Sequence, residues 1–169
     1  MASGRPLLIA LGGPGEWDEK LVGGKAAKLA RLAVADFEVP KGFCLTTRAY
    51  EAFVNDAGIA PSIRMELGRK SMDDMRWEEI WDTALRIRAK FLAQPLSALL
   101  RETVAEGLRG FDPSVPLAVR SSAVGEDSAG RSFAGLHESI IGVRGGQAVE
   151  DAIRLVWASL WSDAALLYR

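Results

Sequence analysis

Residues 117–139 read LAVRSSAVGEDSAGRSFAGLHES, which joins a short apolar segment to a polar loop rich in serine and glycine. Arg120 stands at the junction between the two parts. The planar guanidinium of arginine suits phosphate, serine hydroxyls add hydrogen-bond donors, and small residues let backbone N–H groups approach a ligand closely. The pattern is typical of an anion-binding loop, although a solvated loop between two strands has a similar composition.

Apolar patterning predicts strands on both sides of this loop and helices elsewhere. Strands are expected at residues 42–45, 115–120 and 139–143, the last two as a hairpin-like pair around the loop. Helices are expected at about residues 25–35, 47–57, 73–92, 95–108 and 147–161, with one more capped by Ser162-Asp163. This order of elements predicts a mixed fold, α/β (α+β) in class.

The expected helix at 73–92 has apolar residues at helical spacing, with Arg88 as the one polar exception among them. We expect these residues to be buried in the core: Trp77, Ile80, Trp81, Ala84, Leu85, Phe91 and Leu92. Paired tryptophans can also stack on a nucleotide base, but packing is the simpler interpretation.

Composition limits the kinds of partner. The 169 residues are 49% hydrophobic, enough for one domain or two small lobes, and 21 basic against 22 acidic residues give a net charge of -1. We therefore expect neither nucleic acid nor a membrane surface as partner, and any anion site must be local. The apolar run at residues 6–11 is shorter than the roughly 20 residues of a membrane span, so a cytoplasmic location is expected.

Cys44 is the single cysteine, which excludes an internal disulfide and a cysteine-rich metal site. Because Phe43 and Leu45 flank it, we expect a buried structural role on a strand.

Two common nucleotide-binding fingerprints are absent. In a Walker loop, Gly24-Lys25 would be followed by serine or threonine and preceded by glycine at position 19, but the chain has Ala26 and Glu19. Residues 12–15 read GGPG, which lacks the G-x-G-x-x-G spacing of dinucleotide-binding folds. A nucleotide site here must use another design.

Four segments in order point to such a design: VGGKAAKLARL at 22–32, VPKGFCLTTRAY at 39–50, AVRSSAVGEDSAGRSFAGLHES at 118–139 and SLWSDAALLYR at 159–169. Together they resemble the N-terminal nucleotide-binding region of the phosphoenolpyruvate synthase, pyruvate phosphate dikinase and rifampin phosphotransferase superfamily. The resemblance runs from about Leu21 to Arg169 and is weakest between about Gly58 and Pro113.

The resemblance implies an ATP-grasp-like fold, in which the nucleotide lies between two lobes. Residues 1–169 would form the N-terminal part of that domain, with a helical insert at about 59–112, and would be incomplete without a second lobe. It also implies that Lys25 and Arg120 are directed at the phosphates of ATP, which agrees with the positive end of a helix dipole beside Lys25.

Further site residues follow from the same resemblance. Gly135 would let backbone amides close over the triphosphate, and the Ser139 hydroxyl would reach a phosphate oxygen. Secondary contacts are expected from Ser121, Ser122, Glu126 and Asp127. The last two are also candidates to assist Mg²⁺, although they can instead pair with Arg120, and the family's principal metal-binding acids would lie beyond residue 169.

One part of the loop departs from the family pattern. Where relatives often have Gln-Gln-Glu-Thr after Phe-Ala-Gly, this chain has Leu136-His137-Glu138-Ser139, so side-chain contacts at the first two positions are not carried over. His137 is the only histidine. Because the phosphorylated histidine of relatives belongs to a separate domain, we expect His137 to have a hydrogen-bonding or surface role, and we expect no catalytic residue in this chain.

The resemblance implies that ATP donates phosphate to a histidine on a mobile domain, which carries it to pyruvate, another small acceptor or an antibiotic hydroxyl. The expected partners are ATP, Mg²⁺ and the remaining domains of the enzyme, so the isolated chain should be inactive. The alternative is a non-catalytic binding or regulatory lobe that pairs with a separately encoded partner. Its interface would be an exposed edge at Trp157 and Trp161 together with the last helix, which follows Ser162-Asp163.

Overall fold

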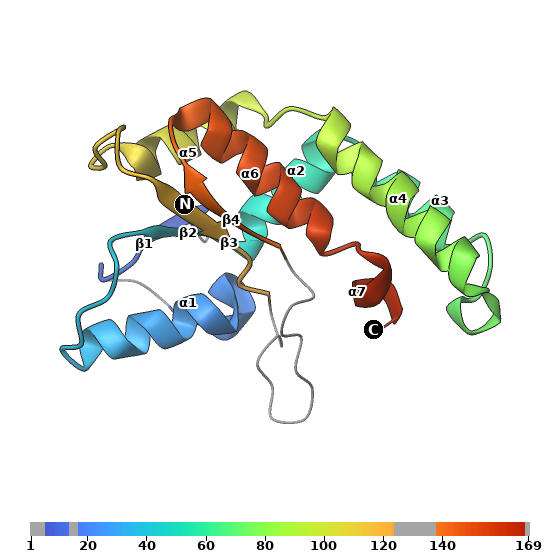
Figure 1. Ribbon diagram of the computed structural model, residues 1–169, viewed down its shortest axis with the longest axis horizontal. Coiled ribbons are helices and arrows are strands. Elements are labelled where there is room, and N and C mark those ends of the chain that lie inside the picture. The colour runs from blue at the N-terminus through green and yellow to red at the C-terminus, as the bar shows by residue number, and fades with distance from the viewer. Residues whose placement is uncertain (1–5, 14–16, 124–137, 168–169) are drawn as a thin grey trace, which may run out of the picture.

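The computed structural model describes residues 6–13, 17–123 and 138–167 (Figure 1). Its elements in chain order are β1 (Leu8–Ala10), α1 (Glu19–Val34), β2 (Phe43–Leu45), α2 (Thr47–Asp56), α3 (Ile59–Leu67), the 3-10 turn η1 (Met72–Asp74), α4 (Trp77–Ala93), α5 (Ala98–Leu108), β3 (Leu117–Arg120), β4 (Ser139–Val143), α6 (Gly146–Ser159) and α7 (Asp163–Leu167). This mixture of helices and small sheets confirms the predicted α/β class in its general form. Among the described residues, no helix is both long and apolar enough to cross a bilayer.

The strands form two antiparallel pairs, β1–β2 and β3–β4. Ile9 lies opposite Cys44 in the first pair, and in the second pair Val119 lies opposite Ile140 and Arg120 opposite Ser139. The pairing of β3 with β4 confirms the predicted hairpin-like arrangement, although β3 begins at Leu117, two residues later than expected. In Figure 1 the strands lie in the left half of the molecule, with α1 below them and α5 and α6 above.

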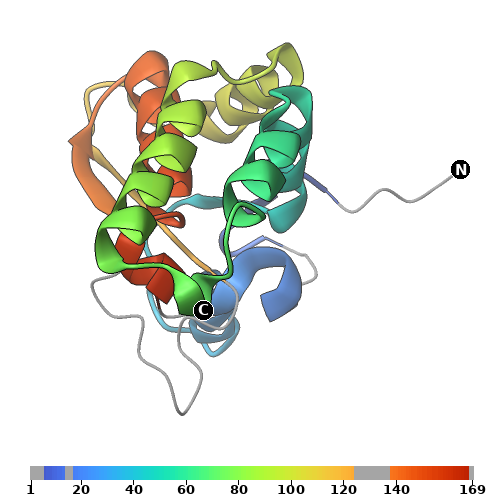
Figure 2. The ribbon, with the colours of Figure 1, turned by 90° about the vertical axis from the view of Figure 1, so that its right-hand side faces the viewer.

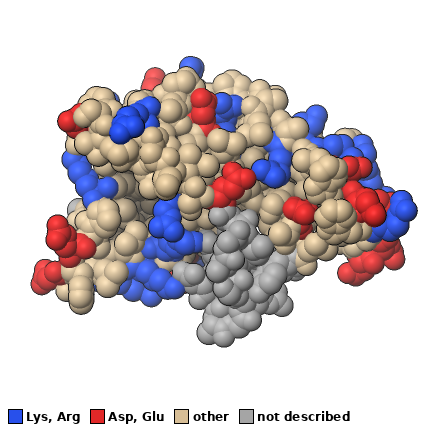
Figure 3. All heavy atoms as spheres, in the orientation of Figure 1, with Lys and Arg blue, Asp and Glu red and all other residues tan. Residues whose placement is uncertain are grey.

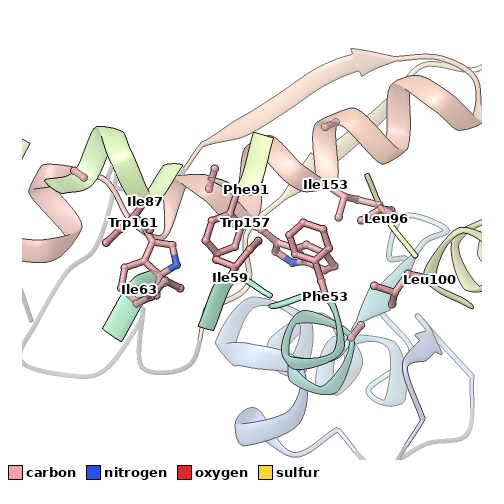
Figure 4. Close-up of a cluster of buried hydrophobic side chains, with 14 of the residues drawn as sticks. Phe53, Ile59, Ile63, Ile87, Phe91, Leu96, Leu100, Ile153, Trp157 and Trp161 are labelled. Atoms are coloured by element: carbon pink, nitrogen blue, oxygen red, sulfur yellow. The ribbon is translucent and has the colours of Figure 1, made fainter. Parts of the chain in front are cut away.

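The helices from α2 to α7 share one hydrophobic core. Phe53, Phe91 and Trp157 form an aromatic group within it (Figure 4). The ring centroid of Phe53 lies 5.8 Å from that of Phe91 and 5.1 Å from that of Trp157. The indole Nε1 of Trp161 donates a hydrogen bond to the hydroxyl of Tyr50 over 2.9 Å. Residues of α5 and α6 join the same cluster, so the predicted helical insert packs on the rest of the chain.

The expectation for α4 is only half right. Ile80, Ala84 and Phe91 are buried as predicted, but Trp77 is 58% exposed and Trp81 45% exposed. Leu85 and Leu92 are also exposed. Figure 2 shows the reason: α4 lies in front of its neighbours and packs on α6, α7 and α3 with one side only, so its other side is uncovered.

The expected exposed edge at Trp157 and Trp161 is wrong. Both side chains are only 9% exposed, because they lie between α6, α2 and α4 within the aromatic core. The tryptophan part of the interface proposed for the non-catalytic alternative is therefore not available on the surface.

The helices α1 and α4 begin at other residues than predicted, and α2 begins as predicted but without a side-chain cap. α1 begins at Glu19 with Asp18 as its N-cap, six residues before the expected start. Thr46 stands at the N-cap of α2, but its hydroxyl donates to the Pro6 carbonyl over 2.8 Å and does not cap the helix. α4 begins at Trp77, after η1, because the Glu79 carboxylate accepts the backbone N–H of Arg76 and fixes the first turn there.

Substitution of two aromatic residues on α4 tests which side of this helix is buried in the core. Phe91→Ala should lower the free energy of unfolding by about 3–5 kcal/mol, since Phe91 is fully buried. Trp81→Ala should cost about 1 kcal/mol or less, because this side chain is half exposed. Urea unfolding of both variants measures the difference, and equal losses would contradict the assignment of α4 faces.

Cys44 gives a second test. Burial raises the pKa of its thiol from the usual 9.0 to about 12, and its Sγ lies 3.6 Å from the Val22 carbonyl oxygen. Iodoacetamide at about pH 8 should therefore label Cys44 slowly in the native protein and quickly in denaturant. Because the folded state keeps the neutral thiol, its contribution to stability should fall as the pH rises from 9.0 toward about 12. Rapid labelling of the native protein would show that the thiol is accessible.

Candidate functional site

The start of α1 crosses the chain segment that follows β3 in direct backbone contact. Gly23 is buried, with φ 76° and ψ 167°, and interrupts the helix there. A Cβ atom at Gly23 would lie 1.6 Å from the carbonyl oxygen of Ser122, so only glycine fits. This glycine therefore brings together two segments that are about one hundred residues apart in the sequence.

Hydrogen bonds hold the crossing together. The Ser122 hydroxyl accepts the backbone N–H of Ala26 over 3.0 Å, and the Ala123 carbonyl accepts that of Gly24 over 3.4 Å. Ser122 thus caps the part of α1 that follows the kink, a role for which serine is well suited. The predicted contact of Ser122 with phosphate is untested, but the structure already uses its oxygen within the protein.

Lys25 lies in the first turn after this kink, beside Ser122-Ala123, and is half-buried. Lys28 follows one turn later and is exposed. N–H groups at the beginning of a helix carry partial positive charge, so the lysine and the helix terminus act in the same direction. This end of α1 is suited to a negatively charged group.

Arg120 and Ser139 are direct neighbours across the β3–β4 pair. Because side chains alternate along a strand, Val119 and Ile140 turn toward the helical core while Arg120 and Ser139 lie on the opposite, open face. Opposed side chains on one face of an antiparallel pair have Cβ atoms about 4.5–5.5 Å apart, close enough to contact the same ligand. Two residues that the sequence assigned to phosphate binding are thereby brought side by side.

The local charge is positive although the protein as a whole is close to neutral. Figure 3 shows Lys and Arg side chains gathered over α1 and the adjoining end of β3. Within residues 6–13, 17–123 and 138–167, Arg120 makes no ion pair with a carboxylate. An exposed arginine of this kind can offer its donors to a ligand.

The remaining predicted residues divide into two groups. Ser121 is described and is buried next to Arg120. Gly135, Glu126, Asp127 and His137 lie outside the described residues, so their predicted roles stay predictions.

The donors at this site suit a polyphosphate better than a metal ion. Lys25 and Arg120 supply positive charge and Ser139 a hydroxyl, all of which bind anionic oxygens. In the part of the chain that the structure describes, no group of three or more His, Cys, Asp or Glu side chains is arranged to hold a metal.

One feature of the site was missed in the sequence. Arg88 of α4 forms an ion pair with Glu138, the residue immediately before Ser139, over 3.1 Å. The backbone N–H of Glu138 also donates to the hydroxyl of Ser159 on α6 over 3.1 Å. The signal for this contact was Arg88 itself, a polar residue in an otherwise apolar pattern.

Comparison with known proteins identifies what kind of domain carries this site. Residues 19–169 match the family described as the pyruvate phosphate dikinase AMP/ATP-binding domain. The chain belongs to this family. The resemblance drawn from the four sequence segments is thus confirmed.

Relatives of this pyruvate phosphate dikinase-type domain include two kinds of enzyme. A phosphoenolpyruvate synthase of Aeropyrum pernix is 39% identical over 88% of this chain and 19% of its own length. A phosphoenolpyruvate synthase of Deinococcus radiodurans is 37% identical over 90% of this chain and 20% of its own length. A rifampicin phosphotransferase of Bacillus cereus is 33% identical over 88% of this chain and 17% of its own length. The chain spans about a fifth of the length of these relatives, which therefore contain further domains.

Two glycines with nearly the same backbone conformation test the crossing. Gly23 has φ 76° and ψ 167°, and Gly145 has φ 81° and ψ 154°, but a Cβ at Gly145 would meet nothing within 4 Å. Gly145→Ala should therefore cost only backbone strain, about 1–3 kcal/mol. Gly23→Ala should cost clearly more, because it adds the clash with Ser122. Thermal or urea unfolding measures both, and equal losses would mean that the close approach of Ser122 is not needed.

Proposed function

We propose that this chain is the ATP-binding part of a dikinase-type phosphotransferase. In this proposal ATP donates phosphate to a histidine on another domain, which passes it to pyruvate or a similar small acceptor. The observation that carries the proposal is the meeting of Arg120, Ser139 and the Lys25 end of α1 at one place in a member of an ATP-binding domain family.

In the proposed complex the chain supplies one wall of the nucleotide site. The domain would be ATP-grasp-like, with residues 1–169 as its N-terminal part and a helical insert at about 59–112, and a second lobe would complete it. The open face of the β3–β4 pair supports this arrangement, because its far side is already covered by α6. An exposed strand face that carries Arg120 and Ser139 is suited to a ligand held between two lobes.

The chain's own contribution is electrostatic. Lys25 and Arg120 would neutralise the phosphate oxygens of ATP, Ser139 would donate a hydrogen bond, and Gly135 would allow backbone amides to approach. A hydrogen bond to a charged group is worth about 1.5–3 kcal/mol. Mg²⁺, when bound with ATP, would supply further neutralisation of the phosphates. Its protein ligands would come from Glu126, Asp127 or the second lobe.

The proposed phosphate acceptor is a small molecule. Relatives named as phosphoenolpyruvate synthase and as rifampicin phosphotransferase each match 88% of this chain, at 39% and 33% identity. The similarity to both supports a shared ATP-binding step. We propose that the choice of acceptor, and the phosphorylated histidine, belong to other domains, so that residues 1–169 alone do not turn over ATP.

Arg120→Ala tests the proposed phosphate contact. In the full-length protein it should raise the dissociation constant for ATP about tenfold or more, since a charge-assisted hydrogen bond is lost. Isothermal titration calorimetry measures this effect. Arg144→Ala is the matched control, because Arg144 is an exposed arginine just after the other end of β4, where its Nε donates to the Ser114 carbonyl over 3.0 Å.

Two results would contradict the proposal. Unchanged ATP affinity in the Arg120→Ala variant would remove the phosphate assignment. Steady ATP consumption by residues 1–169 alone would show that catalysis does not need another domain.

A further inference from the structure

Arg88 of α4 contacts the residue that precedes β4. Its Nη2 atom lies 3.1 Å from Oε1 of Glu138, and the two side chains are 30% and 42% exposed. Arg88 and Glu138 are fifty residues apart in the sequence. This ion pair therefore links the helical layer to the first residues of the site's second strand.

Glu138 is fixed from a second helix as well. Its backbone N–H donates to the hydroxyl of Ser159, over 3.1 Å, and that hydroxyl donates in turn to the Val156 carbonyl over 2.7 Å. Ser159 is buried at the end of α6. The main chain and the side chain of Glu138 are thus held by different helices, which restricts both its position and its rotation.

The next residue in the chain is Ser139, which lies opposite Arg120. Successive side chains of an extended chain point to opposite sides, so a Glu138 side chain held against the helices directs Ser139 toward the open face. The ion pair also neutralises a carboxylate that would otherwise stand unpaired beside the phosphate site. Both effects favour an anion at Arg120 and Ser139.

We propose that Arg88 is a positioning residue for nucleotide binding: through Glu138 it fixes the start of β4 so that Ser139 faces the phosphates, without contacting the nucleotide itself. The inference rests on the proposed function, because it assumes that Ser139 and Arg120 meet phosphate. Small errors in the position of a contacting group reduce binding and catalysis, and supporting contacts of this kind prevent them.

A neighbouring ion pair on the same helix provides a matched control. Arg86 Nε lies 2.9 Å from Oε2 of Glu66, whose side chain is only 5% exposed, and Glu66 belongs to α3. This pair joins α4 to α3, and neither of its residues is next to a candidate site residue in the sequence. A partly exposed pair such as Arg88–Glu138 contributes little to stability, whereas breaking a pair with a buried partner costs more.

The experiment measures the dissociation constant for ATP and the melting temperature of the full-length protein in parallel. Arg88→Gln should weaken ATP binding about two- to fivefold with little change in melting temperature. Arg88→Lys, which keeps the charge, should restore most of the affinity. Arg86→Gln should lower the melting temperature more but leave the ATP affinity within about twofold of the parent protein.

A double variant separates positioning from a general structural effect. In a Ser139→Ala background the residue that Arg88 positions no longer binds, so the effect of Arg88→Gln on ATP affinity should disappear or shrink. An undiminished effect in that background would show that Arg88 acts by another route, and the inference would be wrong.

The remaining outcomes distinguish the inference from the function on which it rests. If Arg88→Gln leaves ATP affinity unchanged while Arg120→Ala weakens it, the positioning role is wrong and the proposed function stands. If neither variant weakens binding, the proposed phosphate site fails and the positioning role fails with it.

Discussion

The site depends on one close backbone approach, in which Gly23 meets the carbonyl of Ser122 without an intervening Cβ. This contact places the beginning of α1 against the segment that leaves β3, and hydrogen bonds from Gly24 and Ala26 complete it. A side chain at position 23 would push the two backbones apart and disturb these hydrogen bonds. The positive charge of the site is therefore a consequence of packing, because the net charge of the whole chain is -1.

The helical layer supports the site from behind. Val119 and Ile140 of the β3–β4 pair pack on the same core as Phe91 and Trp157, so the open face of the strands is backed by a rigid aromatic cluster. Polar contacts extend this support to the edge of the strands, where α4 and α6 both reach Glu138. The arrangement combines an exposed candidate binding face with supporting residues on well-packed helices, which is how precise sites are generally built.

Much of this could be predicted from the sequence. Apolar patterning located the β3–β4 pair. The resemblance to the family nominated Arg120 and Ser139 as phosphate contacts, which stay predictions, and their direct register needed the structure. The kink at Gly23 and the contacts of Ser122 could not be predicted, since they arise between segments far apart in the chain. The mistake on α4 has a different cause: helical spacing shows that Trp77 and Trp81 share a side, but not whether another helix covers it.

Four of the five tryptophans give this protein two optical signals; the fifth, Trp17, lies partly buried against the cluster around Ile9 and Leu21. Trp157 and Trp161 lie in the aromatic core, where rigid neighbours and the bond to Tyr50 make them reporters of tertiary packing in near-ultraviolet circular dichroism. Trp77 and Trp81 lie on the outer side of α4, where water and soluble quenchers reach the indole rings. Fluorescence from the exposed pair can therefore respond to contacts made along α4 while the core signal stays constant, so docking on that helix and unfolding of the domain are separable in one sample.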